Sequence, residues 1–190
     1  LINLQATVQK TIVFITHDFL EALKLGDRVA IMRDGEFVQV GTPEEIVVSP
    51  VDDYVKDFVK DIPRSKVLTA QSSMTDPELI VSPTHTPNDV LSAMRGLNCE
   101  WAFVVDEDSR LQGVLHVADV IKAVEIEQAD LSGISRDSYP EADLHTKLEK
   151  LIPLCIANDS PVAILNQERN FRGVISRVDL MSALETDDET

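Results

Sequence analysis

Cysteine, aromatic residues and basic side chains are scarce in this sequence of 190 residues. The two cysteines, Cys99 and Cys155, are too few for a disulfide scaffold and fit a reducing, cytosolic setting. Only 17 lysines and arginines stand against 33 aspartates and glutamates, and the net charge of −16 argues against nucleic acid as a partner. The four histidines are scattered and lack zinc-ligand spacing with the cysteines, so we expect no metal site.

Long hydrophobic runs are also missing from the sequence. The longest ones, such as TIVFIT and AFVV, are far too short to cross a bilayer. Leu1 opens the sequence without a methionine or a basic region, so we expect no signal peptide, and this start is compatible with a gene-fragment boundary. Hydrophobic residues still make up 44% of the sequence, which is enough for ordinary cores in one or two domains.

The segment of residues 11–46 carries the clearest functional pattern, TIVFITHDFLEALKLGDRVAIMRDGEFVQVGTPEEI. The apolar run Thr11–Thr16 predicts a buried strand, and a polar pair, His17 and Asp18, follows directly at its carboxyl end. Open α/β sheets bind ligands outside the carboxyl ends of their strands. His17 is therefore a candidate site residue.

Local signals mark the elements that follow. Asp34-Gly35 favours a hairpin turn, because type I′ geometry needs positive φ. Thr42 can cap a helix that starts at Pro43, and Glu45 completes a capping box. The expected elements are a helix over 18–25, strands over 28–32 and 36–40, a helix that opens after Thr42, an amphipathic helix over 51–59, and a connector without a clear period over 61–77.

The rest of the sequence contains an internal repeat. Leu111–Glu125 (LQGVLHVADVIKAVE) aligns without gaps on Phe171–Glu185 (FRGVISRVDLMSALE) at an offset of 60, and Gly113/Gly173 is one of the identical pairs. Each unit is expected to fold as strand, helix, strand, turn, strand and helix. Because a unit of about 55 to 60 residues buries too little surface alone, we expect the two to pack against each other.

The repeat resembles a known module. In each βαββα unit the last strand contains Gly-Val and a third hydrophobic residue, and an aspartate follows four residues later at the start of the last helix. This pattern resembles the cystathionine-β-synthase-type (CBS) module, which occurs in tandem pairs. The first module is expected over 78–128 and the second over 129–186, followed by an acidic tail over 187–190. In this family, pairs often bind adenosine-containing ligands, so the resemblance implies an adenine nucleotide or cyclic di-AMP as ligand.

The family holds the ribose with a Ser/Thr-x-x-Asp pattern after the glycine strand. The second module keeps this pattern as Ser176 and Asp179, and the resemblance implies that Arg177 is available for phosphate. The first module keeps Asp119 but has His116 where serine or threonine is usual. A structural role remains the alternative for both aspartates, because aspartate near a helix start caps the helix whether or not a ligand binds.

The segment around His17 closely resembles the last part of an ABC-transporter ATPase domain. There, the histidine at this position contacts the terminal phosphate of ATP, which makes His17 the candidate catalytic residue, whereas Asp18 is expected to cap the next helix. The phosphate loop, the signature loop, the magnesium-binding aspartate and the catalytic glutamate of that family are missing from this sequence. We therefore expect that this chain alone does not hydrolyse ATP.

The combined arrangement resembles the ATP-binding subunit of ABC importers for glycine betaine, proline and related osmoprotectants. The expected fold is α/β, with residues 1–60 as the C-terminal piece of the ATPase domain, a connector and the CBS pair. The resemblance implies ATP as cofactor of the parent subunit, a membrane-spanning partner subunit, a homodimer through both parts, and a cytoplasmic, peripheral position at the inner face of the cell membrane. The alternative is a free-standing CBS pair that binds adenosine nucleotides and uses its first segment for dimerisation or docking.

The acidic balance has two interpretations. It is either a solubilising surface or an electrostatic sensor of ionic strength, because screening lengths shrink from about 10 Å at 0.1 M salt to about 3 Å at 1 M. Regulation of transport by a nucleotide in a module cleft and regulation by ionic strength are therefore both open. The transported solute is not encoded in any pattern of this sequence.

Overall fold

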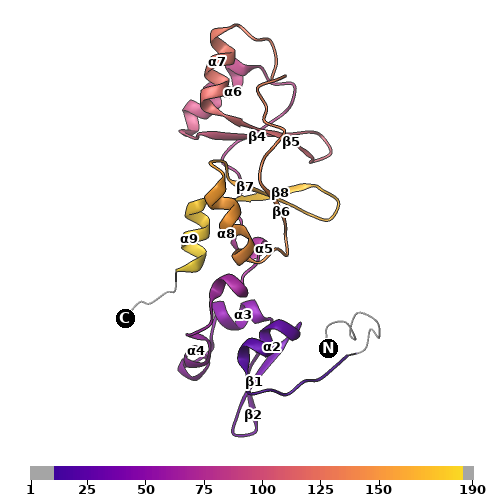
Figure 1. The fold of residues 1–190 in the computed structure, drawn as a ribbon, viewed down its shortest axis with the longest axis vertical. Coiled ribbons are helices and arrows are strands. Elements are labelled where there is room, and N and C mark those ends of the chain that lie inside the picture. The colour runs from indigo at the N-terminus through magenta and orange to yellow at the C-terminus, as the bar shows by residue number, and fades with distance from the viewer. Residues whose placement is uncertain (1–10, 186–190) are drawn as a thin grey trace. The chain divides into compact units, whose positions relative to one another are not determined.

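The computed structural model describes residues 11–185. They fall into two compact units, one that ends at Leu68 and one that starts at Thr69. The acidic tail over 187–190 and the first ten residues of the predicted ATPase piece lie outside the described residues. Figure 1 shows the order of helices and strands along the chain, and each unit is described by itself below.

The first unit is a small hairpin covered by short helices. A β-hairpin forms its only described sheet, and its turn residues Asp34 and Gly35 have φ of 53° and 84°, as the sequence predicts. The buried cluster of this unit is aliphatic, with Ile46 and Val55 fully buried. The elements are α2 (Phe19–Leu25), β1 (Val29–Arg33), β2 (Glu36–Gly41), α3 (Pro43–Val48), α4 (Asp53–Val59) and the 3-10 helix η1 (Arg64–Lys66).

The helix starts in this unit follow the local signals. The Asp18 carboxylate accepts a hydrogen bond from the Glu21 amide at 3.1 Å, so Asp18 caps α2 as predicted. Thr42 and Glu45 form the predicted capping box of α3. The predicted helix over 51–59 begins two residues later, because Asp52 is its N-cap.

The predicted strand over Thr11–Thr16 is wrong. Residues 11–16 have no regular structure, and Val13 and Ile15 are 86% and 92% exposed. A strand requires hydrogen bonds to a neighbour, and within the described residues β1 and β2 pair only with each other. The apolar run therefore has residue types typical of a strand, but no described strand pairs with it.

The second unit contains two copies of the predicted βαββα order. Each copy has a three-stranded sheet, in which a short strand pairs in parallel with the first strand of an antiparallel hairpin. The short helix α5 (Ala70–Ser73) precedes them. Repeat one is β3 (Ile80–Val81), α6 (Pro87–Leu97), β4 (Trp101–Val105), β5 (Leu111–His116) and α7 (Val117–Glu125); repeat two is β6 (Glu141–Asp143), α8 (Leu148–Ala157), β7 (Val162–Leu165), β8 (Phe171–Ile175) and α9 (Arg177–Leu184).

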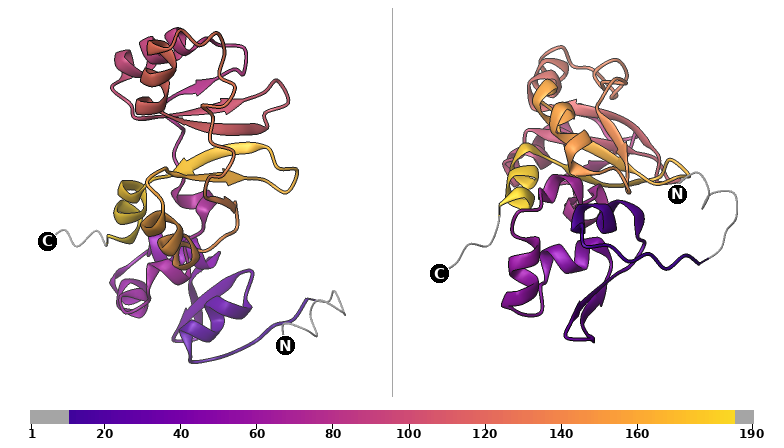
Figure 2. Two further views of the ribbon diagram at one scale, coloured as in Figure 1. Left: turned by 45° about the horizontal axis from the view of Figure 1, so that its top comes forward. Right: turned by 60° about the horizontal axis from the view of Figure 1, so that its bottom comes forward.

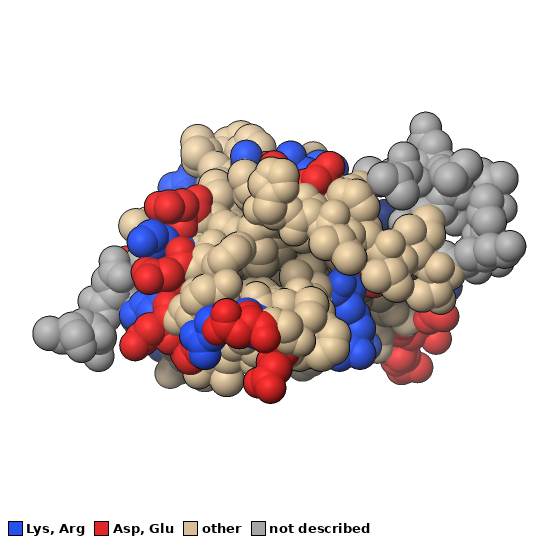
Figure 3. Space-filling view, turned by 90° about the horizontal axis from the view of Figure 1, so that it is seen from below, with Lys and Arg blue, Asp and Glu red and all other residues tan. Residues whose placement is uncertain are grey.

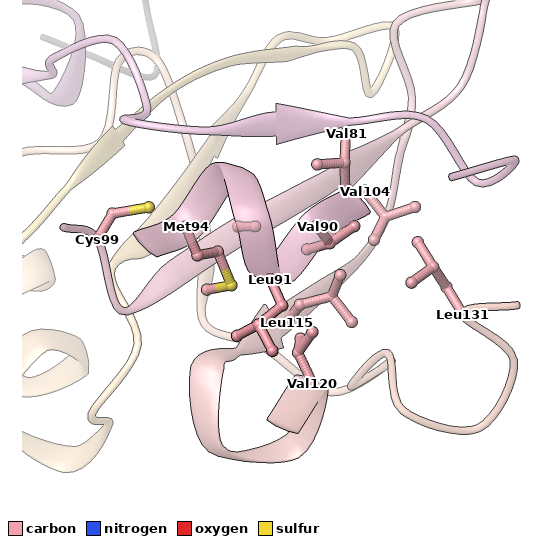
Figure 4. Packing of buried hydrophobic residues seen from close by; sticks show 10 residues of the cluster. Val81, Val90, Leu91, Met94, Cys99, Val104, Leu115, Val120 and Leu131 are labelled. Carbon is pink, nitrogen blue, oxygen red and sulfur yellow. The ribbon is translucent and has the colours of Figure 1, made fainter. Parts of the chain in front are cut away.

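Buried hydrophobic clusters hold the second unit together. Side chains from α6, β4, β5 and α7 point into the core of repeat one, which Figure 4 shows from close by. A second cluster joins the repeats, and in it the rings of Phe103 and Phe171 stack with centroids 5.3 Å apart. The hairpins β4–β5 and β7–β8 accordingly lie side by side (Figures 1 and 2). The expected packing of the two repeats against each other is confirmed.

Each repeat also pairs with a segment that precedes the other repeat. Thr75, ahead of repeat one, forms backbone hydrogen bonds of 2.9 and 3.0 Å with Val174 of repeat two. Arg136, ahead of repeat two, bonds to Val114 of repeat one at 2.9 and 3.2 Å. The expected connector over 61–77 therefore contains η1 and α5 as well as residues that complete repeat two.

Candidate functional site

The two predicted nucleotide positions lie at equivalent junctions, where the last strand of each repeat turns into the last helix. Asp119 lies in the first turn of α7 and Asp179 in the first turn of α9. Both carboxylates are therefore near helix N-termini, whose free N–H groups favour negative charge. Ser176 and Asp179 contact each other at the second junction, whereas the side chain of Arg177 is bonded to the end of α8.

At the second junction, Asp179 takes part in a capping box. One oxygen of its carboxylate, Oδ2, accepts hydrogen bonds from the Ser176 amide at 2.7 Å and the Ser176 hydroxyl at 2.5 Å. The structural alternative is thus present in the geometry, although it uses only one of the two carboxylate oxygens. Arg177 lies against the end of α8, where it donates to the carbonyls of Cys155 at 2.8 Å and Asn158 at 2.9 Å.

At the first junction, Asp119 is paired with cations. Nε and Nη2 of Arg136 donate to its Oδ2 at 3.1 and 2.6 Å, and Nζ of Lys122 lies 3.6 Å from its Oδ1. The hydrogen bonds from Arg136 hold the pKa of the Asp119 carboxyl below its ordinary value. His116 acts as the helix cap here, because its Nδ1 accepts a hydrogen bond from the Ala118 amide at 3.3 Å.

Sequence reasoning missed Arg136 and its aromatic neighbour. The guanidinium carbon of Arg136 lies 5.4 Å from the ring centre of Trp101, within cation–π range. The Trp101 ring in turn lies 4.6 Å from that of His116. No local signal could have revealed this cluster, because Arg136 is 17 residues away from Asp119 in a segment without periodicity.

The remaining predicted site residue, His17, belongs to the first unit. It is exposed and lies on a bend directly before the cap of α2. The Asp18 amide donates to the Thr16 hydroxyl at 3.0 Å, and this hydroxyl donates to the Glu21 carboxylate at 2.9 Å. The bend is thus held by side chains around His17, while the imidazole itself is open to solvent.

The described residues have further features that bear on candidate sites. An open groove of about 420 Å³ runs between α6 and α7 and is lined by Leu91, Ser92, Ile121 and Val124, among others. Among residues 11–185, no cluster of His, Cys, Asp and Glu is placed to hold a metal ion. Nor does that part of the chain contain a helix with the length and apolar character needed to span a membrane.

Charged side chains are mixed on the face shown in Figure 3. Acidic groups in red alternate with basic groups in blue and with broad tan areas of uncharged residues. Exposed apolar side chains such as Phe37, Val51 and Phe58 belong to the surface of the first unit. On this face, acidic charge does not form one continuous patch.

Comparison with known proteins places this geometry in a protein class. Residues 59–126 match the family model of the CBS domain. The fold is similar to that of solved CBS-pair structures at low sequence identity. The match to OpuCA from Staphylococcus aureus covers 58% of this chain and 94% of the OpuCA chain, at 20% identity and a TM-score of 0.53. The match to CBSX2 in complex with AMP covers 60% of this chain and 94% of the CBSX2 chain, at 16% identity and a TM-score of 0.55.

Relatives of higher identity extend over both units. The glycine betaine/carnitine transport ATP-binding protein GbuA of Listeria monocytogenes is 37% identical over 97% of this chain and 46% of its own length. The glycine betaine transport ATP-binding protein OpuAA of Bacillus subtilis is 36% identical over 100% of this chain and 45% of its own length. The chain thus carries a CBS domain, matches the C-terminal part of glycine betaine ABC-transporter ATP-binding subunits, and spans about half the length of these relatives.

Proposed function

We propose that this chain is the C-terminal portion of the ATP-binding subunit of an importer for glycine betaine, proline and related osmoprotectants, and that its CBS pair regulates transport. The observation that carries the proposal is the similarity to GbuA and OpuAA over nearly the whole chain, across both compact units. A resemblance confined to one unit would support only a CBS module or only an ATPase fragment.

The proposal assigns a role to each part. Residues 1–60 belong to the ATPase domain, where the exposed imidazole of His17 contacts the terminal phosphate of ATP bound by the parent subunit. Residues 61–77 connect it to the modules over 78–128 and 129–186, and 187–190 form an acidic tail. Catalysis needs the phosphate loop and the metal-binding residues as well, so this chain alone is expected to be inactive.

The partners follow from the transporter assignment. A membrane-spanning subunit binds the ATPase part, which places the protein in the cytoplasm at the inner face of the cell membrane. Two copies associate through the ATPase and CBS parts, and the groove between α6 and α7 offers an open helical surface for the CBS contact. Osmoregulation is the physiological purpose that the transported solutes imply.

We further propose that the regulatory ligand is an adenine nucleotide or cyclic di-AMP held by Asp179. A carboxylate at a helix start can accept hydrogen bonds from ribose hydroxyls, while the free N–H groups attract phosphate. CBSX2, whose fold is similar, was solved in complex with AMP. Ionic strength acting on the acidic surface is the competing regulatory signal.

Isothermal titration with AMP, ATP and cyclic di-AMP tests the ligand. Asp179→Asn should lose a saturable signal because it removes the charge while it keeps an acceptor for the capping box. Asp89→Asn is the matched control, since Asp89 fills the same place in the Thr86 capping box of α6. Loss of binding in both variants would indicate a folding effect, and salt-dependent association that survives Asp179→Asn without any titration signal would favour electrostatics.

The alternative function is a free-standing CBS pair that binds adenosine nucleotides. The DNA sequence upstream of the codon for Leu1 distinguishes these two functions. An open reading frame there that encodes a phosphate loop and a signature motif supports the transporter subunit. A start codon next to Leu1 would support the free-standing module.

A further inference from the structure

Asp119 and Asp179 are equivalent in sequence but differ in what surrounds them. Both carboxylate oxygens of Asp119 are engaged by cations of the same chain: Oδ2 by Arg136 at 2.6 and 3.1 Å, and Oδ1 by Lys122 at 3.6 Å. Asp179 accepts through Oδ2 from Ser176 only, and its Oδ1 has no hydrogen bond or ion pair within residues 11–185. Only the second repeat therefore leaves a carboxylate oxygen for a ligand.

Two contacts besides the ion pair hold Arg136 in position. Its backbone pairs with Val114 through two hydrogen bonds, which fixes the position of the Cα atom. Its guanidinium group lies over the Trp101 ring, and the side chain is 48% exposed. A planar guanidinium fixed in this way loses little further freedom when it binds a carboxylate, which strengthens the ion pair with Asp119.

Among the described residues, the second repeat has no counterpart of this arginine. Val114 and Val174 are equivalent positions, and the residue paired with Val174 is Thr75. Thr75 thus takes the place that Arg136 has in the first repeat, and its side chain brings no positive charge. Arg177, the nearest arginine in sequence to Asp179, is bonded to the carbonyls at the end of α8.

Ribose and guanidinium compete for the same acceptor. A ribose offers two hydroxyl donors to a carboxylate, and the guanidinium fork of Arg136 already occupies Asp119 with two N–H donors. We infer that Arg136 is an internal plug of the first nucleotide position, so that the CBS pair takes one adenine nucleotide per chain, at Asp179. This inference rests on the proposed nucleotide-binding function and adds its stoichiometry and the residue that sets it.

The stoichiometry of AMP binding to the full 190-residue chain tests the plug. Isothermal titration of the unaltered chain should give one AMP per chain, and Asp119→Asn should leave this number and the affinity unchanged within twofold. Arg136→Gln should raise the number to two, because it frees the Asp119 carboxylate. The second site should disappear again in the double variant Arg136→Gln/Asp119→Asn.

Arg169→Gln is the matched control. Arg169 also forms a two-pronged ion pair, with Glu141 at 2.8 and 2.9 Å, but the pair lies at the hairpin turn of repeat two. Its loss should therefore leave one AMP per chain. Thermal unfolding of each variant shows whether it folds. A folded Arg136→Gln variant that still binds one AMP overturns the plug, and if Arg136→Gln does not fold, loss of an AMP in Asp119→Asn still overturns it.

The outcomes separate this inference from the proposed function. Two AMP per chain without any substitution, or one that is lost in Asp119→Asn, overturns the plug but leaves nucleotide binding intact. Absence of AMP from the unaltered chain with one AMP gained in Arg136→Gln supports the plug and overturns the role of Asp179. Absence of AMP from every folded variant overturns both.

Discussion

Gly113 and Gly173 occupy the same place in the two repeats, each beneath the segment that pairs with its strand. A Cβ atom added at Gly173 would lie 2.8 Å from the backbone carbonyl oxygen of Thr75, which cannot rotate away. At Gly113 the added atom would overlap the Ser135 hydroxyl, the end of a side chain that can turn. The repeat thus retains glycine because another strand approaches the backbone closely.

Gly173→Ala is expected to destabilise the protein by about 1–3 kcal/mol, the usual range for overpacking. The reason is that the backbone segment around Thr75 must shift and weaken its pairing with Val174. The control is Gly96→Ala in α6, where no atom beyond the neighbouring backbone of the helix itself lies within 4 Å of the new methyl group, and helix propensity favours alanine by up to about 1 kcal/mol. Urea unfolding of both variants checks this, and equal stability of the two would refute the close approach.

The residues that the sequence predicted correctly act over short distances. The Thr42 cap, the Asp18 cap and the Asp34-Gly35 turn each depend on backbone groups a few residues away, so the local sequence determines them. Asp119 and Asp179 were identified by the repeat, but their different surroundings were not. Arg136 comes from a distant segment, and only the fold brings it to Asp119.

At the scale of elements, the β-hairpins of the two repeats are copies of each other down to the turn. Asp106 Oδ1 accepts hydrogen bonds from the Asp108 and Arg110 amides at 3.0 and 2.8 Å. Asn166 Oδ1 accepts the same two bonds in repeat two, at 3.0 and 2.8 Å. The two backbone donors of this turn are thus satisfied by an aspartate in one repeat and an asparagine in the other. Asp106 differs in that its Oδ2 also accepts a hydrogen bond from Nε2 of Gln112 at 2.6 Å.

Asp106→Ala and Asn166→Ala should therefore each destabilise the protein by about 1–2 kcal/mol, because two backbone donors lose their acceptor. Asp106→Asn should destabilise less than Asp106→Ala, since it keeps the acceptor of both backbone donors and loses only the bond from Nε2 of Gln112 to Oδ2. Denaturant unfolding of the three variants provides the measurement. If Asp106→Asn destabilised as much as Asp106→Ala, charge rather than hydrogen bonding would stabilise the turn.

Element prediction failed where pairing partners decide the structure. The run Thr11–Thr16 has the composition of a buried strand, yet no described strand pairs with it and it remains irregular. The segment over 61–77 has no period, yet Thr75 joins repeat two through backbone bonds that any residue except proline could make. Periodicity reports which side chains are buried; it does not report which backbones meet.

At the scale of the whole molecule, the two units differ in how much core they have. The first unit has a two-stranded sheet and a set of exposed apolar side chains, including Ile15 at 92% exposure. The second has two sheets that share a buried cluster around Phe103 and Phe171. Because a two-stranded hairpin is marginal alone, local stability should be lower in the first unit.

Hydrogen exchange measured by mass spectrometry is expected to show this difference. Amides of α2, β1, β2 and α4 should exchange at least about tenfold faster than those of β4, β5, β7 and β8, since about 1.4 kcal/mol of local opening free energy corresponds to that factor. Peptides from the hairpin β1–β2 and from β7–β8 are the most direct comparison. Stronger protection of the first unit would contradict the expected order.

The segment before each repeat pairs with the other repeat, and this exchange suggests how the chain evolved. The stretch with Thr75 completes the later repeat, and the stretch with Arg136 completes the earlier one. Two identical single-repeat ancestors that exchanged their arms in a symmetric dimer would show the same pattern once gene duplication and fusion had joined them. A single repeat expressed alone would therefore need to dimerise to recover the backbone pairing that the other repeat's leading segment provides in this chain.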